Sequence, residues 1–99
     1  MNKFEIFFSS TFKEELDNIY NYIYSSLNSP ITAVKFYKMV KNSIQNLDFF
    51  PERFPKIELY NLRKLTIKNF IIIYKIDEKA EQIYILHIFH GNQDYFNKL

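Results

Sequence analysis

From residue 12 onward, the spacing of apolar side chains changes once, from a helical repeat to the pattern of strands. Between residues 12 and 47 apolar residues recur every three or four positions, which places them on one face of a helix. Between residues 62 and 89 they alternate or form short continuous runs, as they do in strands. This change of repeat predicts an α+β domain in which helices are packed against a sheet.

Two helices are predicted, at residues 10–27 and 30–48, with a break before Pro30. Pro30 suits the first position of the second helix because its missing N–H has no partner there. Thr11 and Glu14 have the spacing of a capping box at the start of the first helix. Because the connection is short, we expect the two helices to form an antiparallel hairpin.

Strands complete the predicted fold. A first strand at residues 3–8 precedes the helices, and three more at 62–68, 70–77 and 83–89 follow them. Asn69 tolerates a positive φ and is expected to form a tight turn between two of these strands. The order is β-α-α-β-β-β, with the helical hairpin packed on one face of a mainly antiparallel sheet. The predicted core residues are Leu16, Ile23, Val40, Ile44, Leu65 and Ile72.

Composition restricts the class of protein further. The 99 residues allow one domain, residues 1–99, and 11 Phe with 8 Tyr supply bulky material for its core. The absence of cysteine excludes disulfides, thiolate metal sites and a cysteine nucleophile. The longest apolar run, at residues 70–74, is far too short to span a bilayer. We expect a cytoplasmic protein that needs no cofactor and no metal and does not bind a membrane.

Positive charge is concentrated in the middle of the chain. Residues 51–76 contain six basic and two acidic side chains, whereas residues 1–50 are neutral overall. Strand alternation places Lys64 and Lys68 on one face, opposite Arg63, and Lys75 lies one strand away. With the apolar side chains facing the helices, these lysines are predicted to lie on the open face of the sheet. They could bind a phosphate backbone or an acidic partner segment, or could simply be a solvated face.

A second group of polar residues follows the last predicted strand. His90 is a candidate general acid, and Gln93 and Asp94 lie just after it. His87 and His90 are three residues apart and should point to opposite faces of a strand, which disfavours a shared metal ion. Gly91, the only glycine, suggests an unusual backbone conformation at the end of the strand.

The order of these features resembles the RelE/ParE superfamily of toxins from bacterial type II toxin–antitoxin modules. The resemblance implies a helical hairpin on a sheet, growth inhibition, and neutralisation by a cognate antitoxin in an oligomeric assembly. The ending His90-Gly91-x-Gln93-Asp94 is more similar to ParE-type and plasmid-stabilisation proteins. The matching segments are residues 12–23, 29–36, 47–51, 63–74 and 85–94.

Two activities are known in that superfamily: poisoning of DNA gyrase on the ParE side and ribosome-dependent cleavage of mRNA on the RelE side. The mRNA-cleaving members place an arginine where this chain has Ile71 and a basic residue where it has Gln93. They also carry a C-terminal helix for which the last residues leave no room. These departures favour a non-enzymatic gyrase inhibitor. The alternative is a metal-independent ribonuclease, with His90 as the acid and Lys64 and Lys68 as the phosphate clamp.

A third alternative is a degenerate toxin that only binds its antitoxin. In each case the antitoxin is expected to fold on binding, with acidic residues meeting the basic segment. The residues predicted to bind antitoxin, target or phosphate are Arg63, Lys64, Lys68, Lys75, Gln93 and Asp94.

Overall fold

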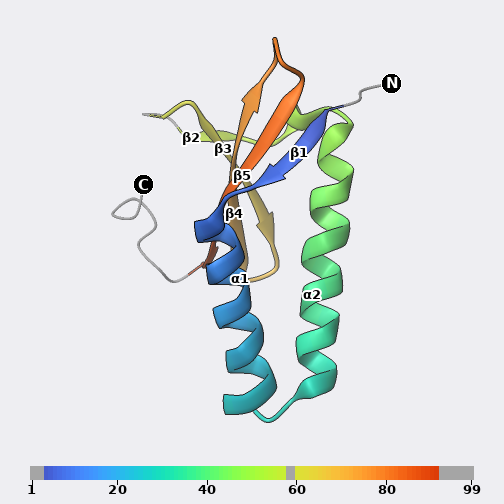
Figure 1. Ribbon diagram of the computed structural model, residues 1–99, viewed down its shortest axis with the longest axis vertical. Coiled ribbons are helices and arrows are strands. Elements are labelled where there is room, and N and C mark those ends of the chain that lie inside the picture. Colours follow the sequence, from blue (N-terminus) through green and yellow to red (C-terminus); the bar gives the residue numbers. More distant parts are fainter. Residues whose placement is uncertain (1–3, 58–59, 92–99) are drawn as a thin grey trace.

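The computed structural model of the protein describes residues 4–57 and 60–91. A helical hairpin covers one face of a five-stranded sheet, as Figure 1 shows. The elements are, in chain order, β1 (Glu5–Phe8), α1 (Ser10–Asn21), the π-helical turn η1 (Tyr22–Ser26), α2 (Pro30–Gln45), the 3₁₀ turns η2 (Asn46–Asp48) and η3 (Pro51–Arg53), β2 (Lys56–Ile57), β3 (Leu62–Ile67), β4 (Phe70–Asp77) and β5 (Gln82–His90). The strand order is β1-β5-β4-β3-β2, with β1 parallel to β5 and all other neighbours antiparallel. The predicted α+β fold is confirmed.

Both predicted helices are present, but the first is capped differently from the prediction. The backbone N–H of Phe12 donates to Oγ of Ser9 at 2.9 Å, so Ser9 is the N-cap residue. Thr11 lies inside α1, and the predicted capping box of Thr11 with Glu14 is therefore wrong. The cap lies earlier because β1 ends at Phe8 and the chain turns at once into the helix.

The sheet differs from the prediction in two local features. A short additional strand, β2, directly follows Pro55 and pairs with the start of β3. The turn between β3 and β4 places the positive φ on Lys68, at 52°, and not on the expected Asn69. Pairing of the flanking strands therefore outweighs the local preference of asparagine at this turn.

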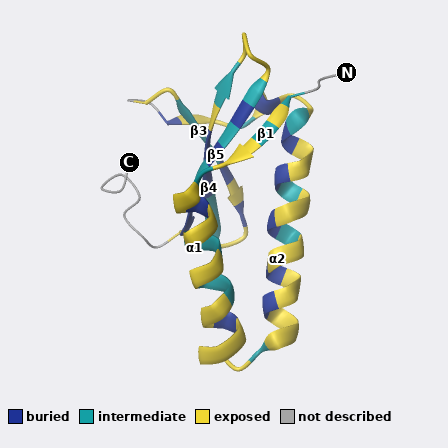
Figure 2. Ribbon diagram, in the orientation of Figure 1, coloured by how far each residue is buried: buried dark blue, intermediate teal, exposed yellow. Residues whose placement is uncertain are grey.

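The main core lies between the helices and the sheet. Figure 2 shows a row of buried residues along the side of α2 that faces α1, whereas α1 itself contributes one buried residue, Phe12. Five of the six predicted core residues are buried, and Leu16 is half-buried against them. The buried members of this core are Phe12, Ile23, Ala33, Phe36, Val40, Ile44, Leu47, Leu65, Ile67, Ile72, Tyr74, Ile83, Ile85 and Ile88.

A smaller apolar cluster forms on the opposite face of the sheet. It joins buried Ile57, Ile73 and Phe89 with the partly buried Leu62 and Ile71. Because β4 contributes alternate residues to both clusters, its continuous apolar run is explained by burial on both faces.

The segment between α2 and β2 is held against the sheet by one buried hydrogen bond. The hydroxyl of Tyr74 on β4 donates to the carbonyl oxygen of Pro51 at 2.6 Å. The Tyr74 side chain is fully buried. Burial disfavours the phenolate and raises the pKa of Tyr74 to about 12.

This pKa predicts a specific loss of stability in alkaline solution. An unfolded tyrosine loses its proton near pH 10, at about its ordinary pKa. The folded protein keeps the Tyr74 proton up to about pH 12. The contribution of Tyr74 is therefore complete below pH 10 and declines as the pH rises toward 12, with a slope of at most about 1.4 kcal/mol per unit. Urea unfolding at increasing pH should show the wild type losing stability faster than Tyr74→Phe. Parallel curves for the two proteins would contradict this prediction.

Candidate functional site

A bulge in β5 determines which side chains reach each face of the sheet. Ile73 is paired with His87 and the next residue, Tyr74, is paired with Ile85, so Leu86 has no partner in the β4–β5 ladder. The extra residue reverses the alternation of side chains. Ile85 belongs to the core beneath the helices, and so does Ile88, three residues later.

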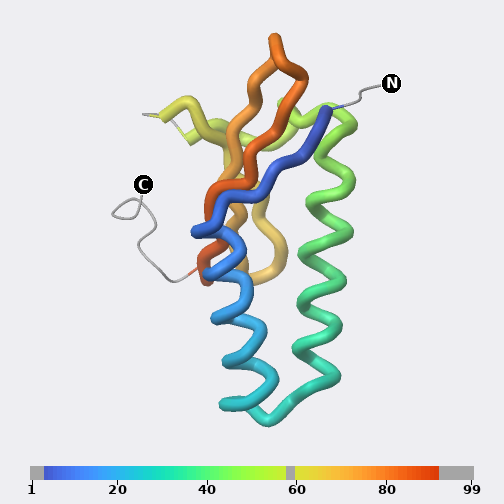
Figure 3. The backbone as a smooth tube through the Cα atoms, in the orientation of Figure 1, coloured from blue at the N-terminus to red at the C-terminus, as the bar shows by residue number. Residues whose placement is uncertain are grey.

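The same bulge is the point where β1 leaves the sheet. Figure 3 shows β1 running beside β5 before the chain turns into α1. The last backbone contact along this edge is the N–H of Ser9 donating to the carbonyl oxygen of Ile85 at 2.9 Å. Beyond it, β5 has no strand on this side within the residues described here.

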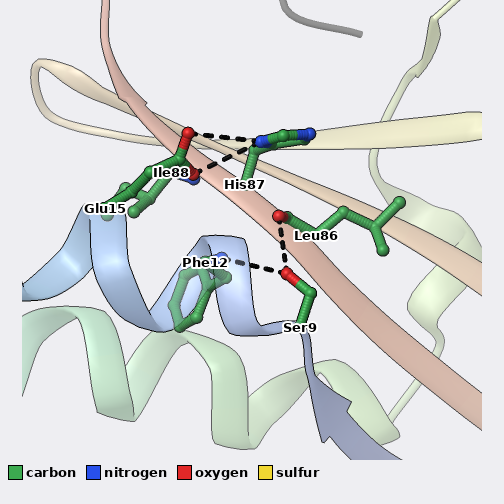
Figure 4. Close-up of polar contacts among 6 residues, drawn as sticks. All are labelled: Ser9, Phe12, Glu15, Leu86, His87 and Ile88. Atoms are coloured by element: carbon green, nitrogen blue, oxygen red, sulfur yellow. Dashed lines mark hydrogen bonds and ion pairs between the residues drawn. The ribbon is translucent and has the colours of Figure 1, made fainter.

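Side chains of α1 and its cap take over the hydrogen bonding of the β5 edge, as Figure 4 shows. Oγ of Ser9 donates to the carbonyl oxygen of Leu86 at 2.8 Å, and Oε1 of Glu15 accepts from the backbone N–H of Ile88 at 3.0 Å. The Glu15 carboxylate also lies 3.3 Å from Nδ1 of His87. His87 thus has a structural partner, and its ring stacks on Phe89 with the centroids 5.0 Å apart.

A hollow of about 320 Å³ opens at the end of the β3–β4 hairpin. It brings together Lys68 and His90, two of the predicted site residues. Its lining consists of Thr66, Lys68, Asn69, Ile71, His90 and Gly91. The lining residues thus include a lysine, a histidine and a threonine beside an isoleucine, residue types that suit an anionic group.

His90 and Gly91 close one side of this hollow. The His90 ring meets Phe70 edge-on, with centroids 5.5 Å apart. Gly91 does not have a positive φ, so the expected unusual conformation is wrong. The residue is instead held close to Asn69, to whose carbonyl oxygen its N–H donates. A Cβ at Gly91 would lie 3.1 Å from that oxygen, which is a tight contact.

The remaining predicted residues are distributed over other parts of the sheet. Lys64 is paired with Ile73 and shares the face away from the helices, as predicted. Lys75 is exposed and lines a separate hollow of about 480 Å³ beyond the other end of β4. Gln93 and Asp94 lie outside the described residues.

Arg63 also lines this separate hollow, but its guanidinium supports the fold. Nη1 of Arg63 donates to the carbonyl oxygens of Glu52 at 2.9 Å and Phe54 at 2.7 Å. These contacts hold the segment that leads into β2. The basic residues that sequence reasoning grouped together are thus spread along β4, with Lys68 at one end, Lys64 beside its middle, and Arg63 and Lys75 toward the other end.

Sequence reasoning singled out Ile71 only as a departure from the mRNA-cleaving members, and it did not include Ile71 or Thr66 among the binding residues. The alternation that placed Lys64 and Lys68 on one face also places Thr66 there, so the signal was present. Across residues 4–57 and 60–91, no three His, Asp or Glu side chains are grouped so that they could hold a metal ion. Within the same ranges, no helix is long and apolar enough to cross a membrane.

Comparison with known proteins identifies the family. The sequence pattern of the ParE toxin of type II toxin–antitoxin systems matches residues 6–95. Curated protein sequences yield no match.

Solved structures agree in fold. One from a chromosomal ParDE system of P. aeruginosa superposes with a TM-score of 0.76 at 21% identity, covering 88% of this chain and 95% of that one. Another, from the RelBE2 toxin–antitoxin complex of Mycobacterium tuberculosis, has a TM-score of 0.64 at 18% identity, with 91% and 93% covered. The fold described above is that of a RelE/ParE superfamily toxin. Within that superfamily, the chain belongs to the ParE toxin family of type II toxin–antitoxin systems.

The contact between α1 and the β5 bulge can be tested by removing its acceptor. Glu15→Leu leaves the N–H of Ile88 without a hydrogen-bond partner and should lower the free energy of unfolding by about 1–3 kcal/mol. Glu15→Gln retains an amide oxygen as acceptor and should lower it less. The neighbouring Glu14 is exposed, so Glu14→Leu serves as the matched control. Equal urea midpoints for Glu15→Leu and Glu14→Leu would show that the contact contributes nothing.

Proposed function

We propose that this member of the ParE toxin family inhibits DNA gyrase and that a cognate antitoxin neutralises it. Family membership defines the chain as a toxin of a type II module. The choice of gyrase as the target depends on the chemistry of the hollow beside His90.

The observation that supports this choice is the apolar side chain of Ile71. Ile71 lines the same hollow as Lys68 and His90, at the position where mRNA-cleaving relatives carry an arginine. Cleavage of RNA passes through a pentavalent phosphate whose negative charge must be stabilised by cations. With isoleucine in this place, the described part of the hollow offers one lysine and one histidine, which favours a binding surface over a nuclease centre.

One observation favours the alternative, ribosome-dependent mRNA cleavage. Lys68 and His90 share a single hollow with the hydroxyl of Thr66. A cation beside an imidazole is the minimum for holding a phosphate and protonating a leaving oxygen. His90 would then be the acid, and Lys64 and Lys68 would hold the phosphate.

An antitoxin partner is supported by an apolar hollow between α2 and the β3–β4 turn. The hollow has a volume of about 430 Å³. Its lining combines apolar side chains with two lysines: Ile23, Thr32, Lys35, Phe36, Met39, Lys68 and Phe70. Such a surface suits an amphipathic segment that carries acidic residues beside its apolar face and folds as it binds.

Inhibition of gyrase and cleavage of mRNA predict different responses to His90→Ala. A gyrase inhibitor needs no general acid, so purified His90→Ala protein should inhibit DNA supercoiling as the wild type does. A nuclease that loses its acid should lose about 10²–10⁴-fold in rate, and toxicity with it. Gyrase supercoiling assays and primer extension on mRNA from expressing cells are the two measurements. Codon-periodic cuts in mRNA together with normal supercoiling would overturn the proposal.

The antitoxin is also expected to reach the open sheet face, because Lys68 lines both the hollow beside α2 and the hollow beside His90. Reversing charge on that face tests this contact. Lys64→Glu with Lys68→Glu should weaken antitoxin binding about tenfold at moderate salt, because two attractive contacts become repulsive. The control is Lys56→Glu with Lys79→Glu, since both lysines line the hollow beyond the other end of β4. Unchanged affinity in the first variant, measured by calorimetry, would contradict this placement.

A further inference from the structure

Two adjacent phenylalanines project from the segment between α2 and β2. The Phe49 and Phe50 side chains are 61% and 59% exposed, although both are large and apolar. Their rings meet edge to face with centroids 5.0 Å apart. They form one exposed aromatic surface, which we name the Phe49–Phe50 pair.

The backbone at this pair has a conformation that a bulky residue rarely adopts. Phe50 has φ 55° and ψ 62°, in the left-handed region. A phenylalanine there is a genuine outlier and typically costs about 1–3 kcal/mol. Because the ring is not buried, the gain from packing Phe50 into the core does not offset this cost.

The conformation is held by hydrogen bonds from three side chains that converge on this segment. Nη1 of Arg53 donates to the carbonyl oxygens of Phe49 and Phe50, and Nη2 donates to Asn46 at 3.2 Å. The hydroxyl of Tyr74 holds the carbonyl of Pro51. Arg63 holds the carbonyls of the two residues on either side of Arg53.

Apolar anchors on either side of the pair point inward. Leu47 and Pro51 are fully buried, and Phe54 packs against the main core. The segment therefore has enough apolar contacts to be fixed without Phe49 and Phe50. Rigid exposed aromatic side chains are the kind of residue that dominates binding energy at protein interfaces.

We propose that the Phe49–Phe50 pair is the anchor by which this toxin binds its protein target. The inference rests on the proposed function only in requiring that the chain acts on a protein. More than half of each side chain is exposed, so burying the pair requires a partner with an apolar pocket that takes both rings. A folded target can offer such a pocket in advance, whereas an antitoxin segment that folds on binding fits the hollows described above.

The charged residues next to the pair on this chain indicate which charges should border the pocket of the partner. Asp48 and Glu52 lie immediately before and after the pair in sequence, and Glu52 is exposed. The nearest cation, Arg53, is turned onto backbone carbonyls and onto the ring of Phe54, 4.6 Å from the ring centroid. The target pocket is therefore one whose apolar floor is bordered by lysine or arginine.

The test uses Phe49→Ala combined with Phe50→Asn in the full chain. Asparagine tolerates the left-handed conformation, so the second change removes the ring without forcing the backbone to move. The matched control is Leu27→Ala with Ile31→Ala, which removes two side chains that are 54% and 72% exposed near the tip of the hairpin. The measurements are growth inhibition on expression, toxin concentration for half-inhibition of supercoiling, antitoxin affinity and sedimentation.

The expected result is that the Phe49/Phe50 variant folds and binds antitoxin as the wild type does, but no longer inhibits growth. The half-inhibitory concentration should rise about 30-fold or more, the size of effect that defines a hot spot. The control should remain toxic. Because growth reports any target, loss of toxicity in the variant with no effect of the wild type on supercoiling would support the anchor and overturn the gyrase proposal.

Four results would overturn the anchor. The variant could remain as toxic as the wild type, or could lose antitoxin affinity by the same factor as toxicity, which would assign the pair to the antitoxin. Sedimentation could show that the wild type self-associates through the pair and that the variant does not. Finally, the wild type could bind antitoxin without inhibiting growth, which would show that there is no target for the pair to bind.

Discussion

The fold depends on how α1 completes the edge of β5. Strands normally satisfy an edge with another strand, but β1 ends at Phe8 and the chain turns into a helix. Two side chains then provide the donor and acceptor that a strand would have supplied, Oγ of Ser9 and the carboxylate of Glu15. Ser9 therefore caps α1 and also provides a hydrogen bond to the exposed edge of β5. The position of the hairpin on the sheet follows from this double role.

The bulge at Leu86, beside the contact of α1 with β5, determines which side chains of β5 face the helices. Without the extra residue, the alternation begun at Ile85 would turn His87 toward the helices and Ile88 away from them. With it, Ile88 belongs to the core, while His87 lies beside Phe89 and keeps its contact with Glu15. The end of β5 then carries His90 to the hollow that it shares with Lys68. Pairing of the strands thus selects which histidine supports the fold and which lies at the candidate site.

Sequence reasoning predicted the features that repeat and missed those that depend on distant segments. Helices, strands and most of the core follow from apolar spacing, which is read locally. The contacts of Ser9 with Leu86 and of Glu15 with His87 join residues more than 70 positions apart, for which no local pattern exists. The bulge depends on the register between β4 and β5, which the apolar spacing of either strand does not specify. Sequence reasoning also grouped the basic residues together, although Lys68 lies at one end of β4 and Arg63 and Lys75 lie toward the other. The positive φ of Phe50 is likewise imposed by Arg53 and by the tertiary contacts of Tyr74 and Arg63.

The parallel pairing of β1 with β5 also determines the order in which the chain can fold. The hairpin and the β3–β4–β5 meander are built from contacts close in sequence, which form early because little chain entropy is lost. The Ser9–Leu86 contact joins residues 77 apart, so β1 must wait until β5 has been synthesised. Until then the sheet lacks one edge and α1 has no carbonyl of Leu86 to hold. During translation the nascent chain therefore passes through a stage in which both helical segments have been synthesised but the toxin fold cannot yet be completed.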